Sequence, residues 1–81
     1  MTETEFNKYQ DVFKKYISDR DLDERTNFID GESTLSRIEK SGLNEVMDSN
    51  IIVHLLMFNY HLLNEEYESA IIMKNIILKD L

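Results

Sequence analysis

The chain of 81 residues contains no cysteine and no proline, and it has only two glycines, Gly31 and Gly42. Without cysteine it can form neither a disulfide framework nor a thiolate metal site, which is typical of a reducing compartment and predicts a cytoplasmic location. With no proline and two glycines, few positions interrupt a helix. Alternating apolar and polar runs rich in Val and Thr are also missing, so strands are not expected. These absences predict an all-α fold.

Basic residues are scarce too: nine Lys and Arg stand against sixteen Asp and Glu, and the net charge is −7. Binding to nucleic-acid phosphates needs Lys and Arg to displace counterions, so direct nucleic-acid binding is not expected. The most apolar run, Ile51 to Leu63, is shorter than the roughly 20 residues that a membrane-spanning helix needs. The chain does not open with a charged and then apolar leader. We therefore expect a protein that stays in solution and does not insert into membranes.

More than half of the apolar residues lie within residues 51–81. This segment reads as two helices, because Asn64 suits a helix end while Glu65 and Glu66 suit the positive first turn of the next helix. We expect a single domain, residues 1–81, in which residues 1–50 form N-terminal helices and residues 51–81 form an apolar antiparallel hairpin. The predicted architecture is a small bundle of four to five helices around that hairpin.

The first hairpin helix is apolar nearly all round and is therefore expected to be buried. Its polar positions are His54, Asn59, His61 and Asn64. One predicted core stripe consists of Ile51, Leu55, Phe58 and Leu62, and a second consists of Ile52, Leu56, Tyr60 and Leu63.

The second hairpin helix, about Glu66 to Asp80, carries apolar residues on opposite sides. The face expected to pack consists of Tyr67, Ala70, Ile71, Ile77, Leu78 and Leu81. Ile72 and Ile76 lie almost opposite this face on a helical wheel. They need cover from the N-terminal half, from a second copy of the chain or from a protein partner, because a hairpin alone cannot cover both sides.

The N-terminal half contains clear helix signals. Thr2 and Glu5 have capping-box spacing and begin a helix that runs to about Ser18. Its predicted inner face consists of Phe6, Tyr9, Val12, Phe13, Tyr16 and Ile17. Leu22, Phe28 and Ile29 predict a short helix stopped by Gly31.

A further helix is predicted at about Thr34 to Ser41, capped by Ser33 or Thr34, with Leu35 and Ile38 facing inward and a left-handed stop at Gly42. Leu43, Val46 and Met47 have helical spacing, and Asp48, Ser49 and Asn50 offer a cap for the hairpin's first helix. The segment between Leu43 and Asp48 is either a separate turn or continuous with that helix.

Two patterns could suggest metal sites. Asp19, Asp21, Asp23 and Asp30 resemble the first, third, fifth and twelfth positions of an EF-hand calcium loop, but Glu24 replaces the glycine of the sixth and Asp30 the longer Glu of the twelfth. His54 and His61 lie about 10.5 Å apart along a helix, too far to share one zinc. His61 and Glu65 could share one, but no third ligand is evident. We expect no metal site and no cofactor.

No catalytic constellation is evident either. No strained turn displays a serine, and neither glycine lies in a loop that would cradle a phosphate. So short a chain can hardly enclose a substrate pocket of several hundred Å³. The sequence therefore predicts a binding protein and not an enzyme.

Lys74 lies in the middle of the expected packed face, and no acidic residue three or four positions away pairs with it. A nonlocal group must therefore interact with its charge. Its ammonium either reaches the hairpin edge, or it pairs with an acid on a partner or on a second chain.

Part of the second hairpin helix resembles a known family. The residues that carry the resemblance are Tyr67, Glu68, Ala70, Ile71, Met73, Lys74, Asn75 and Ile77. They are similar to the second helix of the UVR motif, the helical hairpin of the UvrB and UvrC excision-repair proteins and of McsA-type kinase activators. This family commonly has a second Ala at the position of Ile71 and Arg and Asp at those of Lys74 and Asn75. The resemblance implies protein-protein pairing through the hairpin.

Two functions follow as hypotheses. The first is a small acidic protein-protein interaction module, an adaptor or regulator, that binds a protein partner or itself through Ile72, Met73, Ile76 and Lys74. The alternative is an acidic inhibitor, of a type used by phages, that imitates nucleic acid and blocks a DNA- or RNA-binding protein. That alternative needs a continuous exposed acidic strip, formed by Asp19, Asp21, Asp23, Glu24, Asp30 and Glu32.

Overall fold

The computed structural model describes residues 1–23, 25 and 31–81. Its elements are α1 (Glu3–Tyr16), α2 (Asp19–Leu22), α4 (Thr34–Ser41), the 3₁₀ turn η1 (Leu43–Glu45), α5 (Ser49–Leu63) and α6 (Tyr67–Asp80). Every regular element in these residues is helical, which confirms the all-α prediction. The predicted helix anchored by Phe28 and Ile29 lies outside the described residues, as do Glu24 and Asp30.

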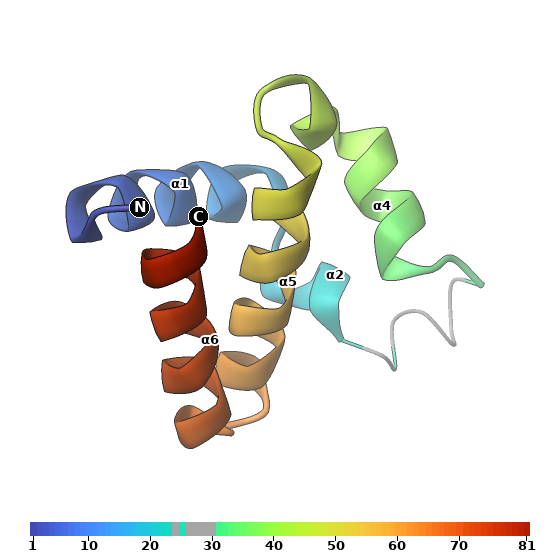
Figure 1. Ribbon diagram of the computed structural model, residues 1–81. Coiled ribbons are helices and arrows are strands. Elements are labelled where there is room, and N and C mark those ends of the chain that lie inside the picture. Colours follow the sequence, from blue (N-terminus) through green and yellow to red (C-terminus); the bar gives the residue numbers. More distant parts are fainter. Residues whose placement is uncertain (24, 26–30) are drawn as a thin grey trace.

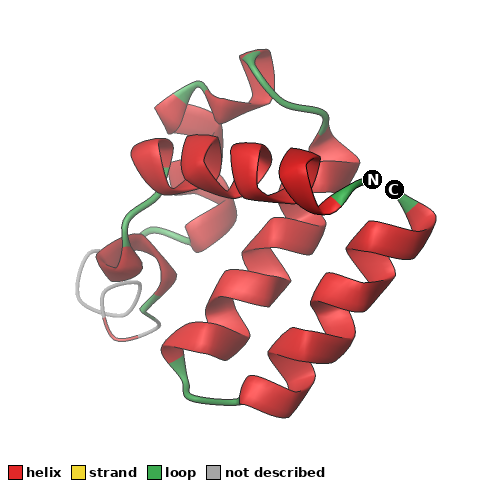
Figure 2. Cartoon of the chain, turned by 90° about the vertical axis from the view of Figure 1, so that its left-hand side faces the viewer, coloured by secondary structure: helices red, strands yellow, loops and turns green. Residues whose placement is uncertain are grey.

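Helices α5 and α6 form the predicted antiparallel hairpin and lie side by side along their length (Figures 1 and 2). Helix α1 crosses the end of the hairpin where α5 begins and α6 ends, and it packs against both helices (Figure 2). Helix α2 and η1 pack against α5, while α4 packs against α2 and η1. The N-terminal half thus covers one end and one side of the hairpin.

None of the helices in the described ranges has the length and apolar character needed to cross a bilayer.

Local signals place most of the helix ends where the sequence predicts them. The backbone N–H of Thr2 donates to Glu5 Oε1 at 3.0 Å, and the N–H of Glu5 donates to Thr2 Oγ1 at 3.1 Å, which completes the capping box of α1. Ser33 caps α4, and Gly42 ends it with a φ of 83°. A left-handed residue at this position suits glycine because it has no Cβ. Asp48 accepts a hydrogen bond from the N–H of Asn50 and begins α5 as a helix separate from η1.

The core lies between the hairpin and the N-terminal helices. Its buried apolar residues are Phe6, Phe13, Ile17, Leu22, Ile38, Leu43, Met47, Ile52, Leu55, Phe58, Ala70 and Ile77. The rings of Phe6 and Phe58 meet edge to face with centroids 5.2 Å apart, and this contact joins α1 to α5. Such aromatic pairs add about 0.5–1.5 kcal/mol beyond the area that they bury.

Several residues that the sequence places inside are exposed. Predicted inward positions that remain accessible are Tyr16, Leu35, Leu62, Leu63, Tyr67 and Ile71. The prediction that the first hairpin helix is buried all round is also wrong, since Val53 and Met57 of α5 are exposed. A domain of this size has too little chain to cover every side of its central helix, because the buried fraction of the surface falls with chain length.

The side chain of Asn59, which the sequence marks only as polar, is buried in the core. Its Nδ2 donates to Gln10 Oε1 at 2.9 Å and to the carbonyl oxygen of Leu55 at 2.7 Å. Gln10 Nε2 donates back to Asn59 Oδ1 at 2.6 Å. The two amides therefore form a reciprocal pair that ties α1 to α5 and satisfies a polar group inside the protein.

Candidate interaction surface

Helix α6 packs on the rest of the protein through one side only. Ala70 and Ile77 are buried on this side, and Met73 and Leu78 pack against the core from its margins. Ala70 and Ile77 stand seven positions apart, so they lie on nearly the same line of the helix, two turns apart. The small side chain of Ala70 allows α6 to approach its neighbours closely.

The opposite side of α6 is open. Ile71 and Ile72 each keep 60% of their surface accessible, and Ile76 keeps 36%. These residues share an arc of about 140° with Glu68, Asn75 and Lys79 on a wheel of 100° per residue. We call this set of six residues the isoleucine face: Glu68, Ile71, Ile72, Asn75, Ile76 and Lys79.

Ile71 and Tyr67 correct the sequence prediction. The sequence places both on the packed side of α6, yet Ile71 belongs to the isoleucine face and Tyr67 is 58% accessible. The helix has apolar residues on nearly every side, so periodicity alone does not show which arc packs. The arc centred on Ala70 and Ile77 packs, and that choice turns Ile71 outward.

Of the four partner-binding residues predicted from sequence, Ile72 and Ile76 lie on the isoleucine face and Met73 and Lys74 do not. Met73 is half-buried at the edge of the core. Lys74 Nζ lies 2.6 Å from Glu3 Oε1 and 5.0 Å from the ring centroid of Phe6. The nonlocal acid that the sequence requires is therefore Glu3 of the same chain. The charge of Lys74 is thus paired with a residue of α1.

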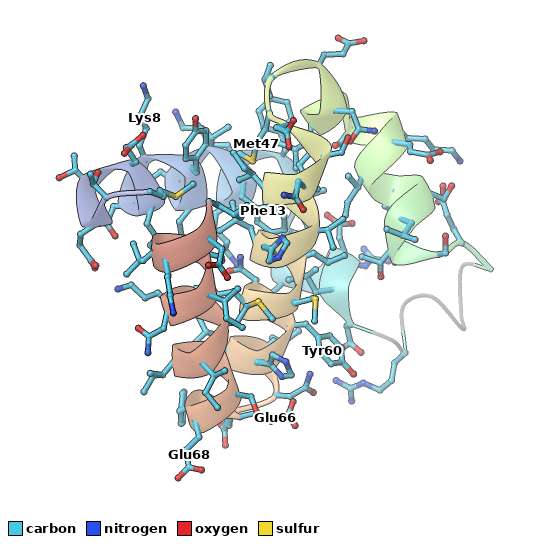
Figure 3. All side chains as sticks on the ribbon, viewed as in Figure 1. Lys8, Phe13, Met47, Tyr60, Glu66 and Glu68 are labelled. Atoms are coloured by element: carbon cyan, nitrogen blue, oxygen red, sulfur yellow. The ribbon has the colours of Figure 1, made fainter. Side chains whose placement is uncertain are left out.

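The isoleucine face carries one charge of each sign, at opposite ends of the helix. Glu68 lies in the first turn of α6 and Lys79 in the last. Figure 3 shows Glu68 pointing into solvent at the end of α6 that is far from α1. Neither side chain makes a hydrogen bond or ion pair with any described residue. Nothing in the sequence singles out these two charges, because the apolar pattern of α6 does not show which of its sides is open.

Three acidic residues of the proposed strip have basic neighbours close by in the sequence. Asp19 pairs with Lys14, Asp23 with Arg25, and Glu32 Oε1 lies 2.5 Å from Lys40 Nζ. The hydrogen bond from Lys40 lowers the pKa of Glu32, and that from Arg25 lowers the pKa of Asp23.

Ser18 caps α2, and Asp21 completes the capping box by accepting a hydrogen bond from the N–H of Ser18 at 2.9 Å. Asp19 and Asp21 thus lie in a helix and not in an open loop of the EF-hand type. The proposed strip also needs Glu24 and Asp30, which lie outside the described residues.

The two histidines have separate partners. His54 Nδ1 lies 2.7 Å from the carbonyl oxygen of Asn50, and His61 Nδ1 lies 3.2 Å from Glu66 Oε1. The acid beside His61 is therefore Glu66 and not Glu65, which adopts a left-handed conformation with φ of 59° in the turn between α5 and α6. Within the described ranges, no three His, Asp or Glu side chains come together as they would around a metal ion.

The surface also has a hollow of about 320 Å³ where α2 meets the end of α5. It is lined by Leu22, Asp23, Arg25, Tyr60, Leu63 and Asn64. Tyr60, labelled in Figure 3, lies on the side of α5 that is turned away from α6. The carboxylate in this lining, Asp23, is already paired with Arg25.

Comparisons of this chain with models of protein families, with curated proteins and with solved structures find no match.

Proposed function

We propose that this protein is a non-enzymatic interaction module, an adaptor or regulator that docks onto a protein through the isoleucine face. The observation that carries the proposal is the open row of Ile71, Ile72 and Ile76 on one side of a helix whose other side is anchored in the core. Contiguous apolar residues on a surface mark interaction sites more often than scattered ones do.

The chemistry of the isoleucine face is suitable for docking. Fully burying an exposed Ile side chain contributes roughly 1.5–3 kcal/mol. Because these three side chains are already partly covered, burial of each at an interface would contribute only part of this free energy. Glu68 and Lys79 lie at the two ends of the face and Asn75 lies among the isoleucines, and these polar groups can select a partner. Apolar residues that recur three and four positions apart on one side of a helix are the usual anchors of a helix that docks onto a protein.

The resemblance of α6 to the UVR-type hairpin helix supports the same kind of role, since that family pairs proteins through its hairpin. The alternative, an inhibitor that imitates nucleic acid, receives less support. Asp19, Asp23 and Glu32 each have a basic neighbour in the fold. A carboxylate paired in this way presents less negative charge to a phosphate-binding site than a free one.

The test compares capture of proteins from a lysate of the native host by three forms of the protein. Wild type is compared with Ile72→Asp/Ile76→Asp and with Leu35→Asp, which adds a single negative charge on α4 at a side chain that is 59% exposed. We expect the double variant to lose partners that wild type and Leu35→Asp retain. Both variants should keep the helical circular dichroism signal of wild type, because surface substitutions change stability by only about 0.5 kcal/mol.

A fourth form, with Asp19, Asp23 and Glu32 changed to Asn, Asn and Gln, tests the alternative. Retention of the captured partners by this form supports the isoleucine face. Loss of the partners from this form, with retention by Ile72→Asp/Ile76→Asp, would overturn the proposal in favour of an acidic inhibitor.

A further inference from the structure

We infer that the occupant of the isoleucine face is a second copy of this chain, packed with its α6 antiparallel to the first. This inference rests on the proposed function and names the partner. Its basis is the position of two unpaired charges, Glu68 and Lys79, at the two ends of the face that carries the three isoleucines.

Four residues form the centre line of the isoleucine face: Glu68, Ile72, Asn75 and Lys79. Their spacing of four, three and four residues is that of the contact line between two supercoiled helices. Ile71 and Ile76 flank this line on either side, where they can cover it from water.

The residues along this line match those of a second copy when the two helices run in opposite directions, because opposite charges then meet. Glu68 and Lys79 are separated by about 16.5 Å along the helix axis, at 1.5 Å per residue. With a twofold axis midway between them, Glu68 meets Lys79 of the second copy, and Lys79 meets Glu68 of the second copy. The same axis places Ile72 beside Asn75 of the second copy. A parallel arrangement would instead place like charges together at both ends.

Charge also explains why an acidic chain can pair with itself here. The protein as a whole carries −7, so two copies repel one another across most of their surfaces. On the isoleucine face Glu68 and Lys79 balance each other, and neither has a partner among the residues that the structure describes. This face is thus a neutral patch with both signs of charge available for cross-chain pairs.

Glu68 and Lys79 also suit the dipole of their own helix, which favours acids in the first turn and bases in the last. This role within one chain makes a prediction that differs from that of the dimer. Exchanging the two charges would make both interactions with the helix dipole unfavourable and would destabilise the helix. It would nevertheless preserve both cross-chain ion pairs.

The experiment measures the mass of the protein in solution by sedimentation equilibrium, at physiological salt and up to roughly millimolar concentration, because an interface below about 1,200 Å² is typical of weak association. Wild type is compared with Glu68→Lys, Lys79→Glu and the double exchange Glu68→Lys/Lys79→Glu. Lys8→Glu is the control, since it makes the same charge change as Lys79→Glu at an exposed position of α1 (Figure 3).

We expect wild type to dimerise reversibly and each single variant to dimerise about tenfold more weakly, since like charges then face each other twice. The double exchange should restore the wild-type constant, and Lys8→Glu should leave it unchanged. Glu68→Lys is the sharpest variant. It reduces the net negative charge and would strengthen association if general repulsion were the only electrostatic effect.

A wild-type protein that stays monomeric at every concentration would overturn this inference and leave the docking of another protein to be decided by the capture experiment. A dimer that the double exchange fails to restore would overturn the antiparallel arrangement. Far-ultraviolet circular dichroism of each variant separates loss of pairing from loss of the helix.

Discussion

Asn59 shows how a single residue can join two elements in a way that its sequence context does not reveal. It is 4% exposed, and its amide exchanges hydrogen bonds with Gln10 of α1. In the sequence it stands only as one of the polar positions on an apolar helix. The pairing depends on a contact between residues 49 positions apart, which local periodicity cannot predict.

Removing one member of this pair should cost more than removing an ordinary surface amide. Gln10→Ala leaves Asn59 with its bond to Leu55 but without a partner for Oδ1. We expect a loss of about 1–3 kcal/mol in the free energy of unfolding, measured by urea denaturation, because a buried polar group then lacks its partner. Asn7→Ala, at an exposed position of the same helix, is the control and should change stability by less than about 0.5 kcal/mol. Equal effects of the two substitutions would contradict a role for the amide pair.

Lys74 is a second residue whose partner the sequence does not identify. Its position predicts that a nonlocal group must interact with its charge, and the structure places Glu3 and the ring of Phe6 there. The need for a partner follows from helical spacing alone. The identity of the partner follows only from the way α1 crosses the hairpin, which no pattern in the sequence expresses.

At the scale of the helices, the ends are predictable and the outward faces are not. The Thr2–Glu5 box, the cap at Ser33 and the stop at Gly42 are local signals, and the structure contains all three. The orientation of α6 about its own axis depends on which of its several apolar sides packs against the core. The side that packs carries Ala70 and Ile77. The expected burial of Leu35 is wrong for a similar reason, since the short helix α4 buries its apolar surface through Ile38.

The capping box of α1 predicts a dependence of stability on pH. The backbone hydrogen bond from Thr2 lowers the pKa of Glu5 below its ordinary value of 4.5. The folded state therefore binds fewer protons than the unfolded state near that pH, so this contribution is present above pH 4.5 and is lost as the pH falls through the folded pKa.

Thermal unfolding at pH 7 and pH 3 checks this effect with two variants. Glu5→Ala should lower the Tm at pH 7 and make a smaller difference at pH 3, because pH 3 lies below the ordinary pKa of 4.5 and the contribution of Glu5 to stability decreases below that value. Glu5→Gln keeps an acceptor oxygen for the capping box but has no carboxyl group that titrates. Its Tm should therefore change less between pH 7 and pH 3 than the Tm of wild type. If the difference in Tm between wild type and Glu5→Ala were equal at both pH values, the pH-dependent contribution of Glu5 to stability would be contradicted.

At the scale of the whole molecule, the chain is too small to surround its own hairpin. Helices α1 and α2 and the turn η1 cover one end and one side of α5, and the isoleucine face of α6 stays open. The sequence predicts this excess of apolar surface and identifies Ile72 and Ile76 as residues that need cover. It does not predict Ile71, Glu68 or Lys79, because these belong to the surface only once α6 is oriented.

The central claim is that the isoleucine face is open in the single folded chain and covered when the protein docks. The measurement that tests it most directly is the relaxation of Ile methyl signals in the NMR spectrum by a soluble paramagnetic probe, in dilute protein and then in concentrated protein. We predict strong relaxation for Ile71, Ile72 and Ile76 and little for Ile52 and Ile77, which are buried. At high concentration the Ile72 methyls should become protected. Protection of Ile72 and Ile76 already in the dilute monomer, to the same degree as Ile77, would contradict the account.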